Sequence, residues 1–373
     1  MGGTLLQRQS SLRSVLFAGG KTGGHLYPGV ATAEVLVASA DAAIAFCGSG
    51  AELPRRECER RGWPYHELPS APVYQAGPLE LVRGMVQNIA GIRRASRLLS
   101  GLRPELVISC GGYEGFPVAL AARIHGVPIM LLEQNAVCGL TNRVLGPLAD
   151  AACAAFPGRR ARPSARRVEV TGNPTRADLA SARADHGAFG LEPGLTTCLV
   201  LGGSAGARSI NRAVMDAAHE LAAIEGLQML IQTGAGDLEA VRKAAERAGL
   251  RAHVSPYLDP IGPALATADF AVARSGGSVF ELALFGLPAV LVPYPHAAAD
   301  HQRANAVYFA RAGAAVVIAD AELTPERLAR EVRRLVSDDE SHRRMSAAMK
   351  RLARPDAARR AAELALETAG RFR

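Results

Sequence analysis

The chain has 373 residues, 49% of them hydrophobic, and because a single core rarely grows this large the length predicts two domains. No segment reaches the roughly 18 to 20 uninterrupted apolar residues that cross a bilayer, which excludes a membrane-spanning segment. The formal net charge of +8 favours an anionic partner: nucleic acid, phospholipid headgroups or a phosphorylated substrate.

The sequence shows no sign of export or of cysteine chemistry. Residues 1–14 lack a continuous apolar stretch that ends at a small-residue cleavage site, so secretion is not expected. The six cysteines form neither a C-x-x-C pair nor a pattern with a nearby histidine, which indicates neither zinc binding nor a disulfide framework. We expect reduced, mostly buried thiols in a cytoplasmic enzyme.

Apolar runs of strand length alternate along the chain with longer helical patterns, such as His25 to Ser39 and Phe116 to His125. Strands that are apolar on both faces belong in a parallel sheet covered by helices, so both halves are predicted to be doubly wound α/β domains. The strands predicted for the first half are Val15 to Ala18, Ala43 to Cys47, Leu106 to Ser109, Pro128 to Leu132 and Val168 to Val170. Those predicted for the second half are Cys198 to Leu201, Met229 to Gln232, Phe270 to Ala273 and Ala289 to Val292, with helices that begin at Ser209, Asp237 and Ser278.

A turn-rich segment, Thr171-Gly172-Asn173-Pro174, follows an arginine- and proline-rich stretch and marks the expected domain boundary. It divides the chain into a first domain of residues 1–170 and a second of residues 171–344. The remaining residues, about 345–373, have a helical pattern, and we expect this terminal helix to pack back on the first domain.

Two glycine-rich turns, Gly19 to His25 and Gly202 to Ala207, each follow a predicted strand and lead into a helix. Backbone N–H groups at such a helix start can hold phosphates and sugar hydroxyls. Neither turn has the Gly-Lys-Ser/Thr ending of a P-loop or the glycine spacing of a dinucleotide fingerprint. A tight turn without a ligand is the alternative for either one alone, but their repetition roughly 180 residues apart favours two nucleotide-fold domains.

Further polar turns follow other predicted strands, at Cys110 to Gly115, at Glu133-Gln134-Asn135 and at Arg274 to Ser278. Since the carboxyl ends of parallel strands lie at one edge of a sheet, these turns are expected to converge on one crevice. Glu281, one turn into the helix that begins at Ser278, is placed to accept hydrogen bonds from ribose hydroxyls. The alternative is an acidic first-turn residue favoured by the helix dipole.

These motifs together resemble the MurG family of peptidoglycan glycosyltransferases, in order from about Val15 to Ala315. The resemblance rests on Gly23-Gly24-His25-Leu26-Tyr27-Pro28, Gly111-Gly112-Tyr113, Glu133-Gln134-Asn135, Gly139-Leu140-Thr141-Asn142-Arg143, Thr171-Gly172-Asn173-Pro174, Gly202 to Arg208, and Arg274-Ser275-Gly276 with Gln302 and Asn305. It implies the GT-B glycosyltransferase fold, in which two Rossmann-like doubly wound domains face each other across a cleft. The first domain then binds the acceptor and meets the membrane, and the second binds the nucleotide sugar.

The resemblance implies an inverting hexosyltransferase that moves N-acetylglucosamine (GlcNAc) from UDP-GlcNAc to the C4 hydroxyl of undecaprenyl-diphospho-N-acetylmuramoyl-pentapeptide (lipid I). The product is lipid II, which is used in peptidoglycan synthesis and hence in cell wall biogenesis, cell shape and cell division. The implied place is peripheral, on the cytoplasmic face of the bacterial inner membrane. The implied partners are UDP-GlcNAc, lipid I, an anionic membrane surface and cell-wall synthesis proteins, without nucleic acid or cofactor.

The same resemblance assigns the substrate-binding residues. Thr22, Gly23 and Gly24 line the donor diphosphate and sugar, and Asn135 and Gln302 lie at the GlcNAc. The rest of the donor site comprises Arg176 at the nucleotide, Ser204 in the second glycine turn, the backbone of Leu258 against the uracil ring, and Glu281 on the ribose. The chain departs from the family pattern at Lys21, Leu132 and His301, and the roles of Lys21 and His301 stay open.

Glycosyl transfer releases UDP with growing negative charge, which helix N–H groups and Arg176 can stabilise. The sequence has no Asp-x-Asp to hold a divalent metal under the diphosphate, so no metal site is predicted. The acceptor hydroxyl needs a base, and His25, with an ordinary pKa of about 6.5, stands at the end of the first glycine turn. The alternative for His25 is a helix-start residue whose ring bonds the backbone.

A helical pattern between Val73 and Leu99 supplies a candidate membrane contact. Its apolar stripe is Leu79, Val82, Met85, Val86 and Ile89, with Arg83, Arg93, Arg94 and Arg97 beside it. The alternative is that the stripe packs into the first domain. Three other functions stay open at this point: a glycosyltransferase that acts on diacylglycerol, a UDP-GlcNAc epimerase, and a UDP-sugar sensor without catalysis.

Overall fold

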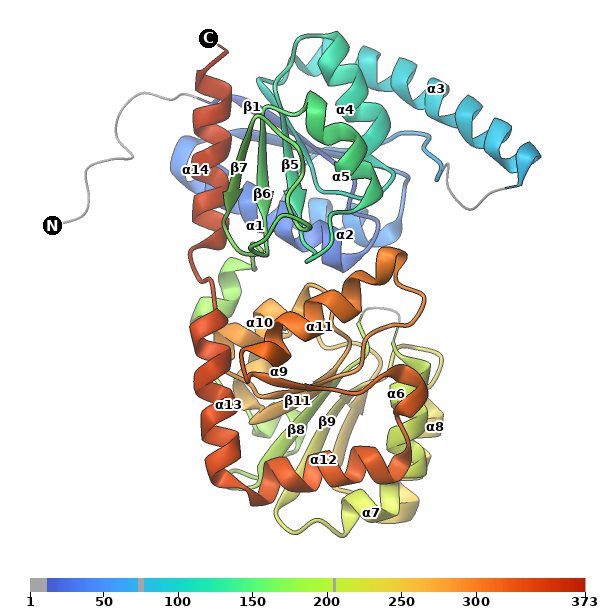
Figure 1. The fold of residues 1–373 in the computed structure, drawn as a ribbon, viewed down its shortest axis with the longest axis vertical. Coiled ribbons are helices and arrows are strands. Elements are labelled where there is room, and N and C mark those ends of the chain that lie inside the picture. The colour runs from blue at the N-terminus through green and yellow to red at the C-terminus, as the bar shows by residue number, and fades with distance from the viewer. Residues whose placement is uncertain (1–11, 73–76, 204–205, 373) are drawn as a thin grey trace, which may run out of the picture. The chain divides into compact units, whose positions relative to one another are not determined.

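The chain divides into two compact units in a computed structural model that describes residues 12–72, 77–203 and 206–372. The first unit comprises Met1–Arg176 and Asp356–Arg373, and the second comprises Ala177–Pro355. Each unit is built on a parallel sheet with helices packed against it (Figure 1). The predicted α/β class is therefore confirmed for both halves of the chain.

Seven parallel strands form the sheet of the first unit, in the order β3-β2-β1-β4-β5-β6-β7. They are β1 (Ser14–Ala18), β2 (Ala43–Gly48), β3 (Tyr65–Glu67), β4 (Leu106–Ser109), β5 (Ile129–Glu133), β6 (Ala151–Ala154) and β7 (Arg167–Val170). The order reverses between β1 and β4, and such a switch point opens a crevice at the carboxyl ends of the strands. All five strands predicted for this half are present, and β3 and β6 are additional.

Alternate residues of β1 face two different helical layers of the first unit. Phe17 packs into a buried cluster with residues of α1 and α14, whereas Leu16 packs into a cluster with residues of α3 and α4. Helices on both faces explain why the strands are apolar throughout. The helices of this unit are α1 (Gly23–Ala40), α2 (Glu52–Glu59), α3 (Pro78–Leu102), α4 (Gly115–Ile124), α5 (Leu140–Leu145), the 3₁₀ turn η1 (Gly146–Leu148) and α14 (Ala357–Gly370).

The second unit has a six-stranded parallel sheet in the order β10-β9-β8-β11-β12-β13. Its strands are β8 (Thr196–Leu201), β9 (Leu227–Gln232), β10 (Ala252–Ser255), β11 (Phe270–Ala273), β12 (Ala289–Leu291) and β13 (Ala315–Val317). Its helices are α6 (Arg208–Asp216), α7 (Ala218–Ala222), α8 (Leu238–Ala248), α9 (Gly262–Thr267), α10 (Ser278–Phe285), α11 (His301–Arg311), α12 (Pro325–Ser337) and α13 (Asp339–Leu352), with 3₁₀ turns η2 (Ala177–Ser181), η3 (Gly187–Phe189), η4 (Ala298–Asp300) and η5 (Asp320–Glu322). The four strands predicted for this half are present.

The chain passes from one unit to the other after Arg176 and again after Pro355, whereas the predicted boundaries fall after residues 170 and 344. Residues 171–175 are buried, and the Thr171 N–H donates to the Ala154 carbonyl at the end of β6, so this turn belongs to the first unit. The expected single terminal helix is two helices, because Ala353 leaves helical geometry and Pro355 follows it. Of these, α13 belongs to the second unit and α14 to the first.

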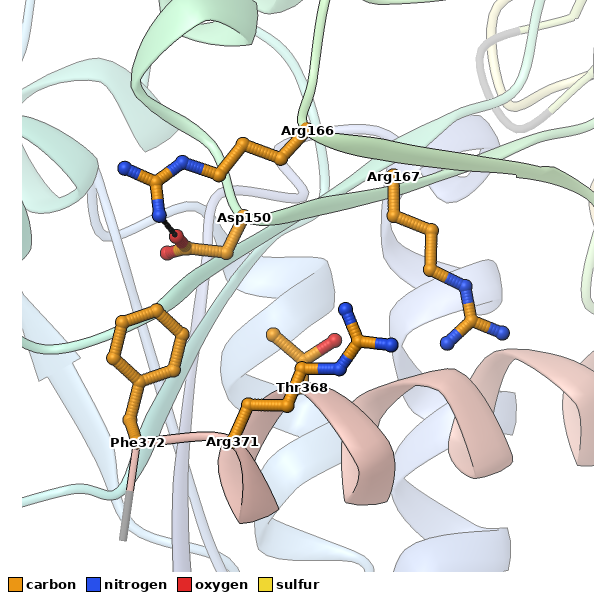
Figure 2. Close-up of a pocket in the computed structure, with 6 residues that line it drawn as sticks. All are labelled: Asp150, Arg166, Arg167, Thr368, Arg371 and Phe372. Carbon is orange, nitrogen blue, oxygen red and sulfur yellow. Dashed lines mark ion pairs between the residues drawn. The ribbon is translucent and has the colours of Figure 1, made fainter.

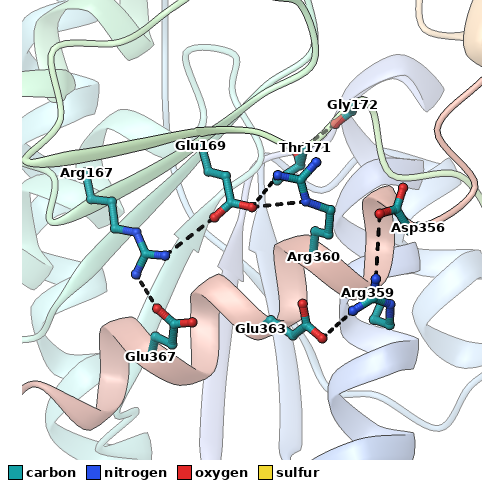
Figure 3. Close-up of polar contacts among 9 residues, drawn as sticks. All are labelled: Arg167, Glu169, Thr171, Gly172, Asp356, Arg359, Arg360, Glu363 and Glu367. Carbon is teal, nitrogen blue, oxygen red and sulfur yellow. Dashed lines mark hydrogen bonds and ion pairs between the residues drawn. The ribbon is translucent and has the colours of Figure 1, made fainter. Parts of the chain in front are cut away.

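Ion pairs fasten α14 to β7 (Figure 3). Arg360 of α14 binds Glu169 of β7, with 2.6 Å between Nη2 and Oε1. Arg167 of β7 contacts Glu169 at 3.6 Å and also pairs with Glu367 of α14. Beneath these pairs Ala361, Leu364 and Ala365 of α14 are fully buried or nearly so. Apolar burial supplies most of the free energy of this docking, and the half-exposed ion pairs set its register.

Candidate active site

Two polar loops of the first unit touch each other at the carboxyl edge of its sheet. Gly19 follows β1 with a φ of +95°, and a Cβ there would lie 2.7 Å from the carbonyl oxygen of Gly111, which follows β4. Only glycine permits both the positive φ and this approach. The predicted convergence of these turns at one edge is therefore present within the first unit.

His25 lies in the first turn of α1 and is half-buried against the second of these loops. A Cβ on Gly111 would lie 3.0 Å from Cδ2 of His25, so the imidazole packs directly on the glycine. The Thr22 Oγ1 is 3.3 Å from Nδ1 of His25. The predicted base thus has a polar side-chain neighbour on Nδ1, which fixes how the ring is turned.

The start of α1 combines exposed backbone with the predicted diphosphate-binding residues. Thr22 stands at the N-cap position, with Gly23 and Gly24 as the first helical residues, and no acidic side chain lies in this first turn. A Cβ on Gly24 would meet nothing within 4 Å, whereas one on Gly23 would press on the Tyr27 ring at 3.1 Å. Gly24 is therefore not required by packing within the chain.

Arg176 is held by an aromatic ring of α1. Its guanidinium carbon lies 4.4 Å from the centroid of the Tyr27 ring, which is a cation–π contact. Tyr27 is one turn along α1 from Gly23, so the predicted nucleotide-binding arginine and the predicted diphosphate loop share one end of this helix.

Lys21 departs from the family pattern, and the structure gives it a neighbour. Its Nζ donates to the Tyr113 hydroxyl at 3.3 Å and lies 5.8 Å from the centroid of that ring. Lys21 is exposed, and Tyr113 belongs to the loop that follows β4. The cation of Lys21 therefore links the loop after β1 to the loop after β4.

Glu133, at the end of β5, organises the loop that carries Asn135. One carboxylate oxygen accepts the backbone N–H of Asn135 at 3.0 Å, and the other accepts the backbone N–H of Gly139 at 2.8 Å and Nδ2 of Asn142 at 3.0 Å. Asn135 also turns its own Nδ2 toward Glu133, at 3.3 Å. No role was predicted for Glu133, although an acid that ends an apolar strand is a signal of such hydrogen bonding.

Gln134 ties the loop after β5 to the loop after β4. It is buried and donates from Nε2 to the Cys110 carbonyl at 2.9 Å. Its Oε1 has no hydrogen-bond partner among the described residues and would lie 3.3 Å from a Cβ on Gly111. Gln134 therefore fixes the backbone against which His25 packs.

In the second unit, Gln232 at the end of β9 joins two predicted donor-site loops. Its Nε2 donates to the Gly203 carbonyl in the second glycine turn at 3.0 Å, and its Oε1 accepts the Leu258 N–H at 3.0 Å. Leu258 is buried, and its N–H is already used inside the protein. Ser204 lies outside the described residues.

Gln302 and Glu281 lie on two helices at the same sheet edge of the second unit. Oε1 of Gln302 accepts the Tyr294 N–H at 3.0 Å, and the Gln302 carbonyl accepts the buried Ser275 hydroxyl at 2.8 Å. Its Nε2 lies 4.0 Å from a Cβ position on Gly276. Glu281 lies in the first turn of α10, as the sequence predicted, and it is half-buried there.

Arg274 connects several segments of the second unit through its guanidinium group. Its guanidinium binds Asp320 at 2.5 Å and Ser209 at 2.8 Å, and it also donates to the Val292 carbonyl at 3.0 Å. The nearby His301 bonds the Ala298 carbonyl through Nδ1 at 2.8 Å. Both side chains are thus engaged with their own unit.

The six cysteines are all buried and unpaired. Burial raises the pKa of Cys58, Cys138 and Cys153 to about 12 and raises the pKa of the other three further. Neutral thiols are poor nucleophiles and poor metal ligands. Among the residues described, no three His, Cys, Asp or Glu side chains gather where they could hold a metal ion.

The apolar stripe of α3 is exposed, which decides against its packing into the first unit. Leu79 is 83% exposed and Ile89 48%, with Val82, Met85 and Val86 between these values. The helix packs instead through a second stripe of mostly small residues: Gly84, Asn88, Gly91, Ala95 and Leu99. A Cβ on Gly91 would lie 2.2 Å from the Pro69 carbonyl, so this close approach requires glycine.

The arginines beside the apolar stripe, Arg83, Arg93, Arg94 and Arg97, are exposed as well. An apolar helix face bordered by basic side chains is typical of a membrane-surface contact. Within the ranges that the structure describes, no helix is long and apolar enough to span a bilayer.

Two Rossmann-like units, each with glycine turns at the carboxyl edge of a parallel sheet, define a two-domain protein of the GT-B type. Residues 15–154 match the glycosyltransferase family 28 N-terminal domain, and residues 197–361 match the family 28 C-terminal domain. The chain is 35% identical over 363 residues to the UDP-N-acetylglucosamine--N-acetylmuramyl-(pentapeptide) pyrophosphoryl-undecaprenol N-acetylglucosamine transferase of Myxococcus xanthus, with 95% of this chain and 93% of the relative covered. It is 40% identical over 365 residues to the protein of that name from Sorangium cellulosum, with 95% and 88% covered.

Solved structures agree with these relatives. The crystal structure of Acinetobacter baumannii MurG matches with a TM-score of 0.73 at 29% identity, covering 95% of this chain and 99% of that one. A UDP-N-acetylglucosamine 2-epimerase matches with a TM-score of 0.70 at 16% identity, covering 97% of each chain, and shares the fold alone. The chain belongs to the MurG family of UDP-GlcNAc-dependent N-acetylglucosaminyltransferases.

Proposed function

We propose that this protein transfers GlcNAc from UDP-GlcNAc to the C4 hydroxyl of lipid I and so makes lipid II for peptidoglycan. The observation that carries the proposal is 35% and 40% identity, over 95% of the chain, to transferases named for this donor and this acceptor. The placement of His25, Thr22 and the loop of Asn135 at one sheet edge supports it. The epimerase likeness extends to the fold only.

His25 is proposed as the base that takes the proton of the acceptor hydroxyl. Thr22 lies at Nδ1, so Nε2 is the ring nitrogen assigned to the proton. Gly111 supplies the flat surface on which the imidazole rests. A single displacement then converts the α-linked donor to a β-linked product, while the bond between the sugar C1 and the diphosphate oxygen breaks and UDP leaves.

We propose that backbone N–H groups and cationic side chains stabilise the departing diphosphate. The start of α1 offers backbone N–H groups with no acid in its first turn, and Gly24 leaves open space beside them. Arg176 adds a full positive charge from the same end of α1. Preorganised donors of this kind lower the barrier because they need no rearrangement as charge develops.

The second unit is proposed to hold the donor nucleotide. Glu281 in the first turn of α10 is assigned to the ribose hydroxyls, and Gln302 on α11 to the sugar. Ser204 keeps its predicted place in the donor site. For Leu258 we assign the backbone carbonyl to the uracil, because its N–H is bonded to Gln232.

The exposed face of α3 is proposed to bring the first unit to the membrane that carries lipid I. Several apolar side chains and four arginines lie along this helix. Each basic residue near an anionic surface contributes about 1 kcal/mol, so the contact is strong enough to persist yet reversible. We assign the enzyme to the cytoplasmic face of the inner membrane, where other cell-wall synthesis proteins are its proposed partners.

The test is transfer of labelled GlcNAc from UDP-GlcNAc to a short-chain lipid I analogue, with diacylglycerol as the competing acceptor. Wild-type protein is expected to label the lipid I analogue only, and His25→Ala is expected to lower kcat by about 100- to 10,000-fold. Turnover of UDP-GlcNAc without any acceptor identifies an epimerase. Binding of UDP-GlcNAc without turnover identifies a sensor, and either result overturns the proposal.

A further inference from the structure

A cavity of about 300 Å³ lies in the first unit (Figure 2). Its lining comes from the start of β6 and β7 and from the end of α14: Asp150, Arg166, Arg167, Thr368, Arg371 and Phe372. In a parallel sheet the starts of the strands lie at the edge opposite to their carboxyl ends. The cavity is therefore separate from His25 and Asn135, which follow carboxyl ends.

Positive charge dominates this cavity, with three guanidinium groups and one carboxylate in its lining. Oδ2 of Asp150 accepts the Ile129 N–H at 3.0 Å, and its Oδ1 makes a single contact with Arg166 at 3.4 Å. The Arg166 side chain is 70% exposed. Because water competes for both charged groups, this ion pair is weak. Arg166 is thus free to turn toward another anion.

The other two arginines of the cavity, Arg167 and Arg371, differ in whether a carboxylate neutralises their charge. Arg167 is engaged by Glu367 and Glu169, the pairs that fasten α14 to β7 (Figure 3). Arg371 contacts no carboxylate within the described part of the chain. It is also the residue that caps the C-terminal end of α14, where the helix dipole repels anions. The positive charge of Arg371 therefore offsets the helix dipole and favours binding of an anion in the cavity.

We propose that this cavity binds a phosphate ester through Arg166 and Arg371. A guanidinium group donates two parallel N–H bonds that match the spacing of phosphate oxygens. Phe372 is 50% exposed in the same lining and offers an apolar surface to the organic part of the ester. Ligand sites run from roughly 300 to 1,000 Å³, so this cavity, at the lower end of that range, suits a group as small as glycerol phosphate.

Two sources carry this chemistry: a small phosphate ester in solution, and the headgroup of a phospholipid. Their shared element is one phosphate bearing a short polyol. The first arm of the test therefore uses sn-glycerol 3-phosphate, and the second uses vesicles of phosphatidylglycerol with phosphatidylcholine vesicles as the reference. Both arms use the full chain at low salt, because a surface anion site is screened as ionic strength rises.

The decisive variant carries Arg166→Gln and Arg371→Gln. Its matched control carries Arg212→Gln and Arg344→Gln, which removes the same charge from two arginines that are 80% and 70% exposed in the second unit. All four side chains are exposed, and thermal melting checks that both variants fold. In the ligand-bound wild type, amide hydrogen exchange is expected to slow in peptides that cover 164–170 and 366–372.

The pocket variant is expected to weaken binding at least tenfold in one arm, whereas the control variant retains wild-type affinity. A loss confined to glycerol 3-phosphate identifies a soluble ester, and a loss confined to phosphatidylglycerol vesicles identifies a headgroup. Equal affinities of the pocket and control variants in both arms overturn the proposal. Exchange protection confined to other peptides overturns it as well.

Discussion

The Thr22 hydroxyl lies 3.3 Å from Nδ1 of His25, so a residue within the first glycine turn also orients the imidazole on α1. Thr22→Val keeps the shape of the side chain and removes this contact. We expect kcat for GlcNAc transfer to fall about tenfold or more, because the base loses its orientation. Thr22→Ser keeps the hydroxyl and is expected to retain most of the activity. A fully active Thr22→Val enzyme would show that the contact has no catalytic use.

Glu133→Gln replaces one oxygen of the carboxylate that accepts hydrogen bonds from the loop of Asn135. The amide places an NH₂ group against N–H donors of Asn135, Gly139 or Asn142, where the carboxylate accepted bonds. We expect the free energy of unfolding in urea to fall by about 1–3 kcal/mol, together with a higher KM for UDP-GlcNAc. Glu220→Gln, at an exposed position on α7, is the control and should change neither value. Equal unfolding curves for both variants would contradict the assigned network.

Lys21→Met removes the cation that links the loop after β1 to Tyr113 in the loop after β4. If a substrate diphosphate passes this point, KM for the substrate that carries it rises several-fold, and the effect shrinks as salt is added. Comparison of the KM values for UDP-GlcNAc and for the lipid I analogue tells which diphosphate it is.

The chain has only two other lysines, Lys243 and Lys350, so reductive methylation followed by mass spectrometry gives a second measure. The substrate whose diphosphate meets Lys21 should slow its labelling and leave that of Lys243 unchanged. Uniform labelling rates with and without both substrates would exclude the contact.

Val82→Glu combined with Val86→Glu places two acids in the exposed apolar stripe of α3. We expect cosedimentation with vesicles of anionic lipid to drop at least fivefold, because the acids oppose both apolar insertion and the neighbouring arginines. The folded state should be unaffected, since both positions are already in water. Ile124→Glu, on α4 and 67% exposed, is the control for a single apolar side chain outside the stripe. Unchanged vesicle binding would place the membrane contact elsewhere.

The buried thiols give a pH dependence whose sign follows from their pKa. Burial raises the pKa of Cys153 to about 12, whereas an unfolded thiol has a pKa of about 8.5. The stabilisation from keeping this thiol neutral is complete below about pH 8.5 and is lost as the pH rises toward 12, because the unfolded chain then releases the proton. The free energy of unfolding in urea should fall between about pH 8 and pH 10. Cys153→Ala should show a shallower fall, and identical slopes would contradict this account.

The sequence predicts most of the strands that are rich in branched or aromatic apolar residues, because these residues favour strands and bury the most apolar area. It misses β6, whose sequence is Ala-Ala-Cys-Ala, since alanine is depleted in strands and only its place between β5 and β7 makes it one. The strands β3, β10 and β13 are missed because three or four residues are too few to show a strand pattern, and pairing with neighbouring strands makes them strands.

The position of the site at the sheet edge also follows from the sequence, because parallel strands end together. The bonds that hold the loops do not, since Gln232 and Leu258 meet only through tertiary folding. The stripe of α3 shows a similar limit. Apolar residues at helical spacing point equally to core and to surface, and the small residues Gly84 and Gly91 on another face decide that the stripe stays outside.

The docking of α14 has a consequence for how this protein is made. The first unit takes its last helix from residues 357–370, so a ribosome has translated the whole second unit before that helix emerges. Until then, Phe17, Val30 and the rest of the cluster shared with α14 lack part of their cover. A nascent chain can therefore complete its second unit first, and a stop codon anywhere before residue 357 leaves the first unit with an open apolar face.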